Sequence, residues 1–76
     1  MLTFESDKDN DRLEIRGDKD GLLKLSKILT EMAQQQDTEH RHLMTEDWGG
    51  GELSNDKQGL ENNLYHHVKI FFWKKK

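Results

Sequence analysis

The chain has 76 residues, which suffices for one small domain over residues 1–76, and it contains no cysteine, which excludes disulfides and cysteine-based zinc sites. The net charge is −3, and the charged residues are unevenly distributed. Residues 1–61 hold fifteen acids and eight bases, whereas residues 62–76 hold four lysines and no acid. Three of these lysines form a basic tail at residues 74–76. An acidic majority disfavours binding to nucleic acid, which depends on neutralising phosphates, and it suits a basic partner.

The first two predicted elements are short strands joined by a polar turn. Leu2 and Phe4 alternate with polar residues, as do Leu13 and Ile15, and the intervening residues 6–11 are typical of a hairpin turn. The acids that follow Phe4 exclude the basic start and apolar run of a signal peptide, and no apolar run is long enough to span a bilayer. We therefore expect a cytoplasmic protein with no membrane partner.

A helix is predicted after this hairpin. Asp18 is a favourable N-cap, and Asp20 places negative charge in the first turn. Apolar residues then recur at spacings of three and four, namely Leu22, Leu25, Ile28, Leu29 and Met32. One side of the helix should therefore face a core, and the helix should end within residues 34–36.

Two further strands are predicted at residues 39–45 and 66–73. They are separated by about twenty residues, which is long for a loop without structure in a compact domain, so we expect a short strand near residues 52–54. The predicted fold class is α+β, in the order β-β-α-β-β. One helix would pack on one face of an antiparallel sheet of about four strands.

The alternation of side chains along the strands assigns them to two faces. The helix-facing set is Leu2, Phe4, Leu13, Ile15, Leu43, Val68, Ile70 and Phe72. The opposite, open face would carry Arg12, Glu14, Arg16, His40, His42, Met44, His67, Lys69, Phe71 and Trp73. The third strand leaves an alternative, in which Met44 is the core residue and Leu43 the outer one. Exposed aromatic residues in one patch often mark an interface, so Phe71 and Trp73 are candidate contacts to a partner or to a second copy in a homodimer.

The histidines are candidate metal ligands. His40 and His42 alternate on one strand, and His66 or His67 could join them from the next strand. A zinc site, however, needs three or four ligands that are supported by further hydrogen bonds. Two alternating histidines more often serve packing or partner contacts, so we predict no metal and no cofactor, and place His40, His42 and His67 among the candidate partner contacts.

The sequence offers no set of catalytic groups. It has no cysteine nucleophile, and Ser54 has no local base or glycine-flanked elbow. The three successive glycines 49–51 lack the lysine and the strand-to-helix context of a phosphate-binding loop. Glu46 and Asp47 are merely adjacent, whereas acid–base catalysis needs carboxylates on either side of a reacting bond. We therefore predict that the protein is not an enzyme.

Trp48 lies between this acidic pair and the glycines and has two interpretations. It could pack on the edge of the core while the glycines permit the bend, or it could anchor a partner, since tryptophan is enriched among interface hot spots. We favour the structural interpretation slightly. Glu46, Asp47 and Glu52 flank it and could face a basic cleft of a partner.

Several segments together indicate a family. They are residues 13–18 with Gly21 and Leu22, residues 40–45, residues 48–50, residues 52–54 and residues 67–70. Over roughly residues 12–73 the chain resembles the immunity protein 32 family of bacterial polymorphic toxin systems. The resemblance implies a small protein that binds and neutralises a cognate toxin domain by stoichiometric occlusion. It implies no particular binding residues.

Two other functions compete with this interpretation. The first is a small homodimeric module that binds a ligand or a metal with the open histidine and aromatic face. The second is a small nucleic-acid-binding domain that uses Phe71, Trp73, Arg12, Arg16 and the lysine tail, which the acidic majority of the chain disfavours.

Overall fold

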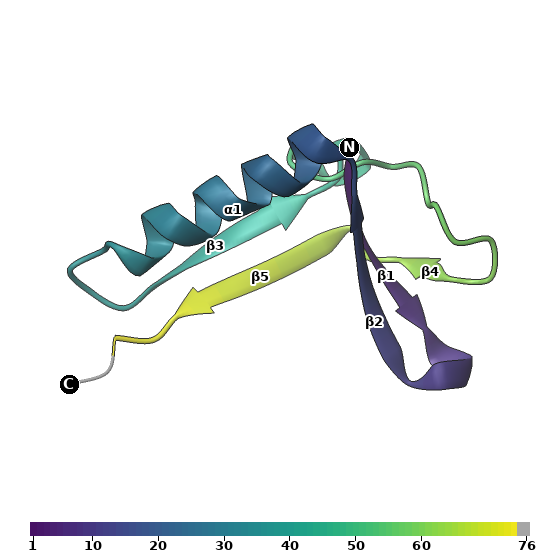
Figure 1. Ribbon diagram of the computed structural model, residues 1–76, viewed down its shortest axis with the longest axis horizontal. Helices are drawn as coiled ribbons and strands as arrows, with labels where there is room; N and C mark the ends of the chain where they lie inside the picture. The colour runs from purple at the N-terminus through teal and green to yellow at the C-terminus, as the bar shows by residue number, and fades with distance from the viewer. Residues whose placement is uncertain (75–76) are drawn as a thin grey trace.

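A computed structural model describes residues 1–74 of the chain. Its elements are β1 (Leu2–Asp7), the 3₁₀ turn η1 (Lys8–Asn10), β2 (Arg12–Gly17), α1 (Lys19–Ala33), β3 (Glu39–Met44), the 3₁₀ turn η2 (Glu46–Trp48), β4 (Asn63–Leu64) and β5 (His67–Phe72) (Figure 1). One helix among antiparallel strands confirms the predicted α+β class and the order of the main elements. Lys75 and Lys76 of the predicted basic tail lie outside the described residues.

The helix begins and ends where its sequence indicates. The Asp18 carboxylate accepts a hydrogen bond of 2.8 Å from the backbone amide of Gly21, which satisfies one of the free donors of the first turn. Gly21 is buried there, and a Cβ atom at this position would lie 1.8 Å from the carbonyl oxygen of Met1. The helix ends at Ala33, with Gln34 as its C-cap. Within residues 1–74, no helix is long and apolar enough to cross a membrane.

The strands divide between two sheets instead of forming the single sheet that was expected. One sheet has the order β2-β1-β4 and the other pairs β3 with β5, and every pairing is antiparallel. The reason is that the second edge of β1 is already occupied. Its Leu2 carbonyl accepts from the Ser54 amide at 2.8 Å, its Phe4 carbonyl accepts from the Tyr65 amide at 2.9 Å, and β4 pairs beyond them. β5 therefore cannot pair along β1.

The segment between β3 and β4 contributes less regular structure than predicted. Where a short strand was expected at residues 52–54, the structure has one isolated parallel bridge between Thr45 and Leu53. Leu53 is nevertheless buried in the core. The short strand of this segment is β4, which lies about ten residues further along the chain than the sequence suggested.

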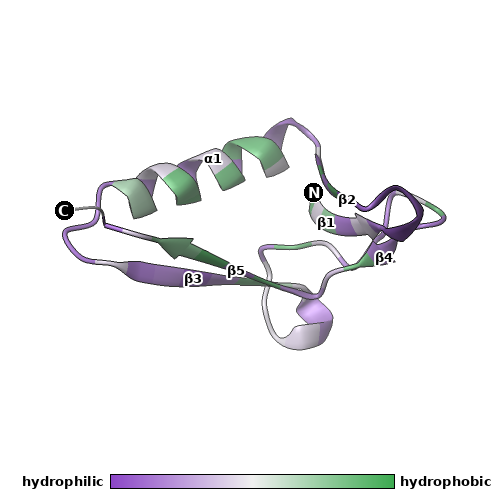
Figure 2. Cartoon of the chain, turned by 90° about the horizontal axis from the view of Figure 1, so that it is seen from below, coloured by the Kyte–Doolittle hydropathy of each residue, from purple (hydrophilic) through white to green (hydrophobic). Residues whose placement is uncertain are grey.

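The core lies between α1 and one face of β3 and β5 (Figure 2). Its buried side chains are Leu2, Phe4, Leu25, Ile28, Met32, Leu43 and Leu53, with Val68, Ile70 and Phe72 packed against them. Leu43 is 1% exposed, whereas Met44 is only half-buried, which decides the alternative at the third strand in favour of Leu43.

Four residues assigned to the core are not in it. In α1, Leu22 and Leu29 are 47% and 44% exposed, because the core contacts only the stripe of Leu25, Ile28 and Met32.

Leu13 and Ile15 are 57% and 48% exposed, although they share a face with Leu2 and Phe4. β2 is the outer strand of its sheet, and the β1–β2 hairpin projects away from α1 (Figure 1). A single helix therefore covers β3 and β5 and leaves most of β2 open to solvent.

Candidate functional site

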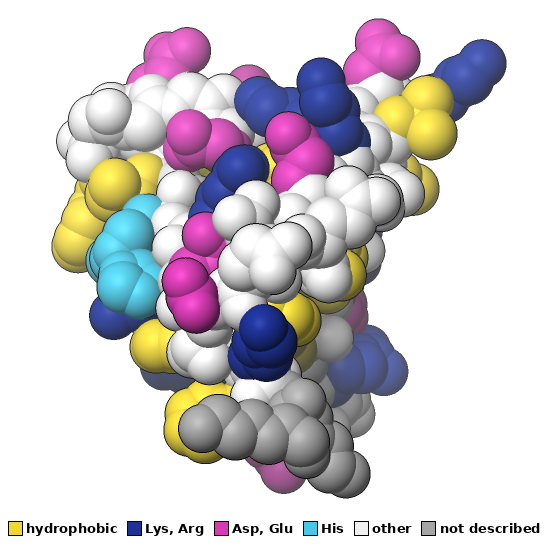
Figure 3. Space-filling view, turned by 90° about the vertical axis from the view of Figure 1, so that its left-hand side faces the viewer, with side chains coloured by type: hydrophobic (Ala, Val, Ile, Leu, Met, Phe, Trp, Pro, Cys, Tyr) yellow, Lys and Arg dark blue, Asp and Glu magenta, His cyan; other side chains and the backbone are white. Residues whose placement is uncertain are grey.

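The face of β3 and β5 that points away from α1 gathers most of the candidate residues. Opposite one another lie His40 and Phe71, His42 and Lys69, and Met44 and His67. We call these six residues the histidine face. Phe71 is 62% exposed, and Trp73, just beyond the end of β5, is 80% exposed. Figure 3 shows the histidine side chains together at one side of the molecule, with hydrophobic side chains above and below them.

Within this face, His42 and His67 form a close pair. The Nδ1 atom of His42 lies 2.7 Å from the Nε2 atom of His67, so one ring must donate a proton that the other accepts. His40 packs edge-on against His42, with 5.1 Å between ring centroids, and also contacts Phe71 at 5.7 Å. Partial desolvation, followed by the positive charges of His67, His40 and Lys69, lowers the pKa of His42.

His66, although adjacent to His67, belongs to a different cluster. Its Nδ1 atom lies 2.8 Å from the Thr45 hydroxyl oxygen, and its ring stacks on Trp48. Within residues 1–74, no group of three or more metal-ligating side chains is arranged to hold a metal ion.

η2 and the glycines after it form a shaped turn next to the histidine face. Gly49 has a left-handed backbone with φ of 89°, and its amide donates to the Glu46 carbonyl at 3.0 Å. At Gly50, a Cβ atom would lie 2.4 Å from the Met44 carbonyl oxygen. Gly51 has open space around it. Glycine is therefore required at two of the three positions, for two different reasons.

Trp48 does not pack on the edge of the core, so the favoured structural interpretation is wrong. The side chain is 57% exposed and stacks on His66, with 5.8 Å between centroids and 10° between the ring planes. The physical reason is that the turn after β3 projects on the side of the sheet opposite α1 (Figure 2), while Leu53 takes the buried place beside the core. One face of the Trp48 ring thus packs on His66, and the side chain remains largely exposed to solvent.

The three acidic candidates around this turn differ in their environment. Glu46 and Asp47 are exposed, and neither carboxylate forms an ion pair within residues 1–74. Glu52 is half-buried, and its Oε1 accepts from the amides of Met44 at 3.1 Å and Gly51 at 3.4 Å. These hydrogen bonds, that of Met44 first, lower the pKa of Glu52. Glu52 therefore holds the turn in place, whereas Glu46 and Asp47 are free to meet a partner.

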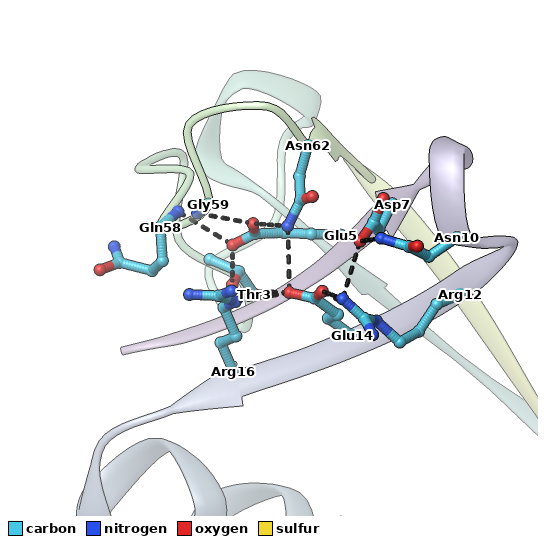
Figure 4. Close-up of polar contacts among 10 residues, drawn as sticks. All are labelled: Thr3, Glu5, Asp7, Asn10, Arg12, Glu14, Arg16, Gln58, Gly59 and Asn62. Atoms are coloured by element: carbon cyan, nitrogen blue, oxygen red, sulfur yellow. Dashed lines mark hydrogen bonds and ion pairs between the residues drawn. The ribbon is translucent and has the colours of Figure 1, made fainter.

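Sequence reasoning missed a buried carboxylate at Glu5, which is 0% exposed (Figure 4). It accepts four hydrogen bonds, from the Thr3 hydroxyl at 2.6 Å, the Gln58 and Gly59 amides at 2.9 Å each and the Asn62 side chain at 3.0 Å. Burial raises the pKa of Glu5, but these hydrogen bonds outweigh it and lower the pKa to about 2. The alternation of side chains along β1 puts Glu5 on the other face of the sheet from Leu2 and Phe4. It gave no sign that the loop at residues 58–62 would cover that face.

The charged residues of β2 also differ from expectation. Arg12, Glu14 and Arg16 were assigned to the same open face as the histidines, but they lie on the other sheet. Arg16 pairs with Glu14 at 2.7 Å, and Arg12 pairs with Glu14 at 3.1 Å and with Asp7 at 2.8 Å. The Asn62 side chain then links Glu14 to Glu5. In this network, drawn in Figure 4, the charged groups pair with one another and with Asn62, and the network is separate from the histidine face.

An open apolar groove of about 280 Å³ lies where the two sheets diverge. Phe4 and Leu13 line it from one sheet, His67 and Val68 from the other, and Tyr65 from between them. None of these five lining residues carries a carboxylate, a thiol or an aliphatic hydroxyl. The arrangement as a whole suits binding by surface contact.

Comparison with known proteins gives one result. No curated protein and no solved structure shows significant similarity to the chain. The model of the family described as Immunity protein 32 matches residues 12–68, which are 57 of the 76 residues. The matched part includes β2, α1, the pair of His42 and His67, and the turn η2 with Glu46 and Asp47, which we call the acidic turn. The resemblance seen in the sequence is confirmed, and the chain belongs to the Immunity protein 32 family.

Proposed function

We propose that this chain is a bacterial immunity protein that binds a cognate toxin domain in the cytoplasm and neutralises it by stoichiometric occlusion. The observation that carries the proposal is the family match over residues 12–68. The site supports it, since the candidate residues include exposed aromatic and charged side chains, and those within residues 1–74 are not arranged as a catalytic constellation. Occlusion requires no bond to be made or broken by the immunity protein itself.

The acidic turn is the proposed contact for a basic cleft of the toxin. Glu46 and Asp47 are exposed, and Trp48 is fixed by its stack on His66, so both charge and an ordered aromatic surface are in place before binding. Complementary charge speeds association, and a tryptophan that is already ordered loses little conformational freedom on binding. Glu52 supports this contact by fixing the turn through the Met44 amide.

The decisive experiment is co-expression with the toxin domain encoded immediately upstream of this gene. The toxin domain alone should arrest growth, and the chain should restore growth and purify with the toxin domain in a one-to-one complex. A chain that neither restores growth nor co-purifies would contradict the proposal. An unrelated small acidic protein, expressed to the same level, controls for an effect of charge alone.

Charge reversal tests the contact at the acidic turn. The double substitution Glu46→Lys and Asp47→Lys should slow association with the toxin domain by about tenfold at low salt, since steering is lost. The matched control is Asp9→Lys with Glu61→Lys, which changes the net charge equally at exposed positions outside the turn. Equal slowing by both pairs would remove the acidic turn as the contact while leaving the neutralising function itself untouched.

A further inference from the structure

The histidine face has an unusual charge for this chain. The chain carries fifteen acids, yet the outward residues of β3 and β5 include none. They are instead three histidines, one lysine, one methionine and one phenylalanine. In an acidic protein, this two-stranded surface is thus set apart by basic and aromatic groups.

The groups that the strand register and the ring contacts place against the histidine pair are neutral or basic, and Glu46 and Asp47 of η2 are the acids just beyond the end of β3. On its own strand His42 has His40 beside it, and on β5 it faces Lys69 with His67 at its ring nitrogen. α1 covers the opposite face of these strands (Figure 2). Within residues 1–74, no carboxylate forms an ion pair with any of these rings or with Lys69.

An anion from outside would therefore favour full protonation of the pair. The 2.7 Å contact between His42 and His67 is a hydrogen bond while the two rings share a single proton. When both rings are protonated, two imidazolium rings lie adjacent beside Lys69, their hydrogen bond is lost, and they repel one another unless a negative group lies against them. A carboxylate that accepts from the imidazolium N–H would supply that group.

The aromatic end of the face complements this charge. The Lys69 ammonium lies 4.9 Å from the centroid of Phe71, so a cation–π contact holds it beside the histidines. Phe71 and Trp73 are the exposed aromatic residues nearest to it along β5 and just beyond. An apolar side chain next to a carboxylate would cover both parts of this surface.

We propose that the histidine face docks an acidic and apolar segment of the toxin domain, with a toxin carboxylate at the His42–His67 pair and an apolar toxin side chain on Phe71 and Trp73. This inference rests on the proposed function. Together with the acidic turn, it requires a toxin surface that is basic where it meets η2 and acidic where it meets β3 and β5. Docking takes up protons, because the bound carboxylate stabilises the doubly protonated pair.

The first test measures protons and affinity together. The toxin domain, separated from the chain in denaturant and refolded, is titrated with the full chain by calorimetry in buffers of different ionisation enthalpy. The expected result is net proton uptake near pH 7 and a Kd that falls from pH 8 to pH 6. Binding without proton uptake and with the same Kd across this range overturns the inference.

The second test uses matched variants. His42→Gln with His67→Gln should abolish the proton uptake and raise Kd about tenfold, and Lys69→Glu should raise it by a similar factor. Lys27→Glu, at an exposed position on α1, is the control with the same change of charge and should leave Kd nearly unchanged. Circular dichroism confirms that each variant is folded. Folded histidine and Lys69 variants that bind like the original chain overturn the inference.

Other occupants of the face give distinct results. A dimer of the chain in sedimentation equilibrium that Phe71→Ala dissociates would assign the face to a second copy, and it overturns the inference. If the toxin domain binds more tightly only when zinc is added, the face is a metal site, and the inference is overturned. If the unsubstituted chain fails to bind the toxin domain at all, the proposed function fails with it. Loss of binding in the folded histidine and Lys69 variants, while the unsubstituted chain binds, supports the inference.

Discussion

The two sheets of this protein use charged and polar residues in opposite ways. In the β2-β1-β4 sheet, Glu5 and Glu14 are surrounded by donors, and every contact in the network of Figure 4 is made within the chain. In the β3–β5 sheet, the outward residues meet one another and solvent, and none of them forms an ion pair with an acid within residues 1–74.

This contrast separates a structural region from the proposed binding region. A polar group whose partners all lie within the chain contributes to folding and has little left to offer a partner. A group with unused donors or an exposed aromatic face contributes little to folding and is available for recognition. The first sheet therefore holds the loop at residues 55–62, and the second sheet, with the acidic turn, is the place to look for partner contacts.

The largest expected effect is at Glu5. Glu5→Ala would remove the acceptor of the buried Thr3 hydroxyl and of the part-buried Gln58 and Gly59 amides. It would also leave the Asn62 side chain with Glu14 alone, so the free energy of unfolding should fall by about 3 kcal/mol. Urea denaturation measures the change, and Glu61→Ala, at an exposed position in the same loop, is the control and should change it by less than about 0.5 kcal/mol. A loss below about 1 kcal/mol at Glu5 would contradict the assignment of the first sheet to stability.

Acid should produce an effect of similar size through the same carboxylate. The pKa of Glu5 is lowered from 4.5 to about 2, so its contribution is complete above pH 4.5 and disappears as the pH falls toward 2. The shift corresponds to about 3 kcal/mol. Unfolding measured from pH 7 to pH 2 should show this loss, and Glu5→Gln should flatten the curve. An unchanged slope in that variant would assign the acid sensitivity to other carboxylates.

The three glycines should rank in a definite order. Gly50→Ala forces a Cβ atom against the Met44 backbone and should cost about 1–3 kcal/mol. Gly49→Ala places a side chain at a left-handed φ of 89° and should cost about 1 kcal/mol. Gly51→Ala meets open space and should change stability by less than about 0.5 kcal/mol. Thermal or urea unfolding of the three variants checks the order, and equal effects would contradict the geometry of the turn.

The smallest effects on stability are expected for exposed residues of the proposed binding region, such as Trp48. Trp48→Ala should lower the free energy of unfolding by less than about 1 kcal/mol, because the residue is 57% exposed, while weakening toxin binding about tenfold or more. Leu60→Ala, at a residue that is 91% exposed, is the control and should affect neither quantity. If Trp48→Ala unfolds the protein, the turn belongs to the structural region after all.

Some features could be predicted because they depend on neighbours in the sequence. The Asp18 cap and the helical spacing of Leu25, Ile28 and Met32 are local signals, and α1 forms as they indicate. Alternation likewise assigned the helix-facing residues of β5 correctly. It also placed the three histidines on one face, because side chains in a strand alternate whatever the strand pairs with.

Other features could not be predicted because they depend on which strand edges are free. Leu13 and Ile15 carry the alternation of a core strand, yet the helix that should cover them lies over a different sheet. Trp48 carried no signal that distinguished a core edge from a surface turn. Its exposure follows from the direction in which η2 leaves β3 and from Leu53 filling the core.

The sequence by itself determined the family, the helix, the two strands predicted at residues 39–45 and 66–73, which the structure places at 39–44 and 67–72, and the grouping of their side chains. All of these rest on short spacings. Only the tertiary structure decided that the strands form two sheets, that Glu5 is enclosed by Asn62 from 57 residues away, and that His42 meets His67 across 25 residues. These contacts are non-local, and they depend on Ser54 and residues 63–65 occupying the edge of β1, which keeps β5 from pairing there.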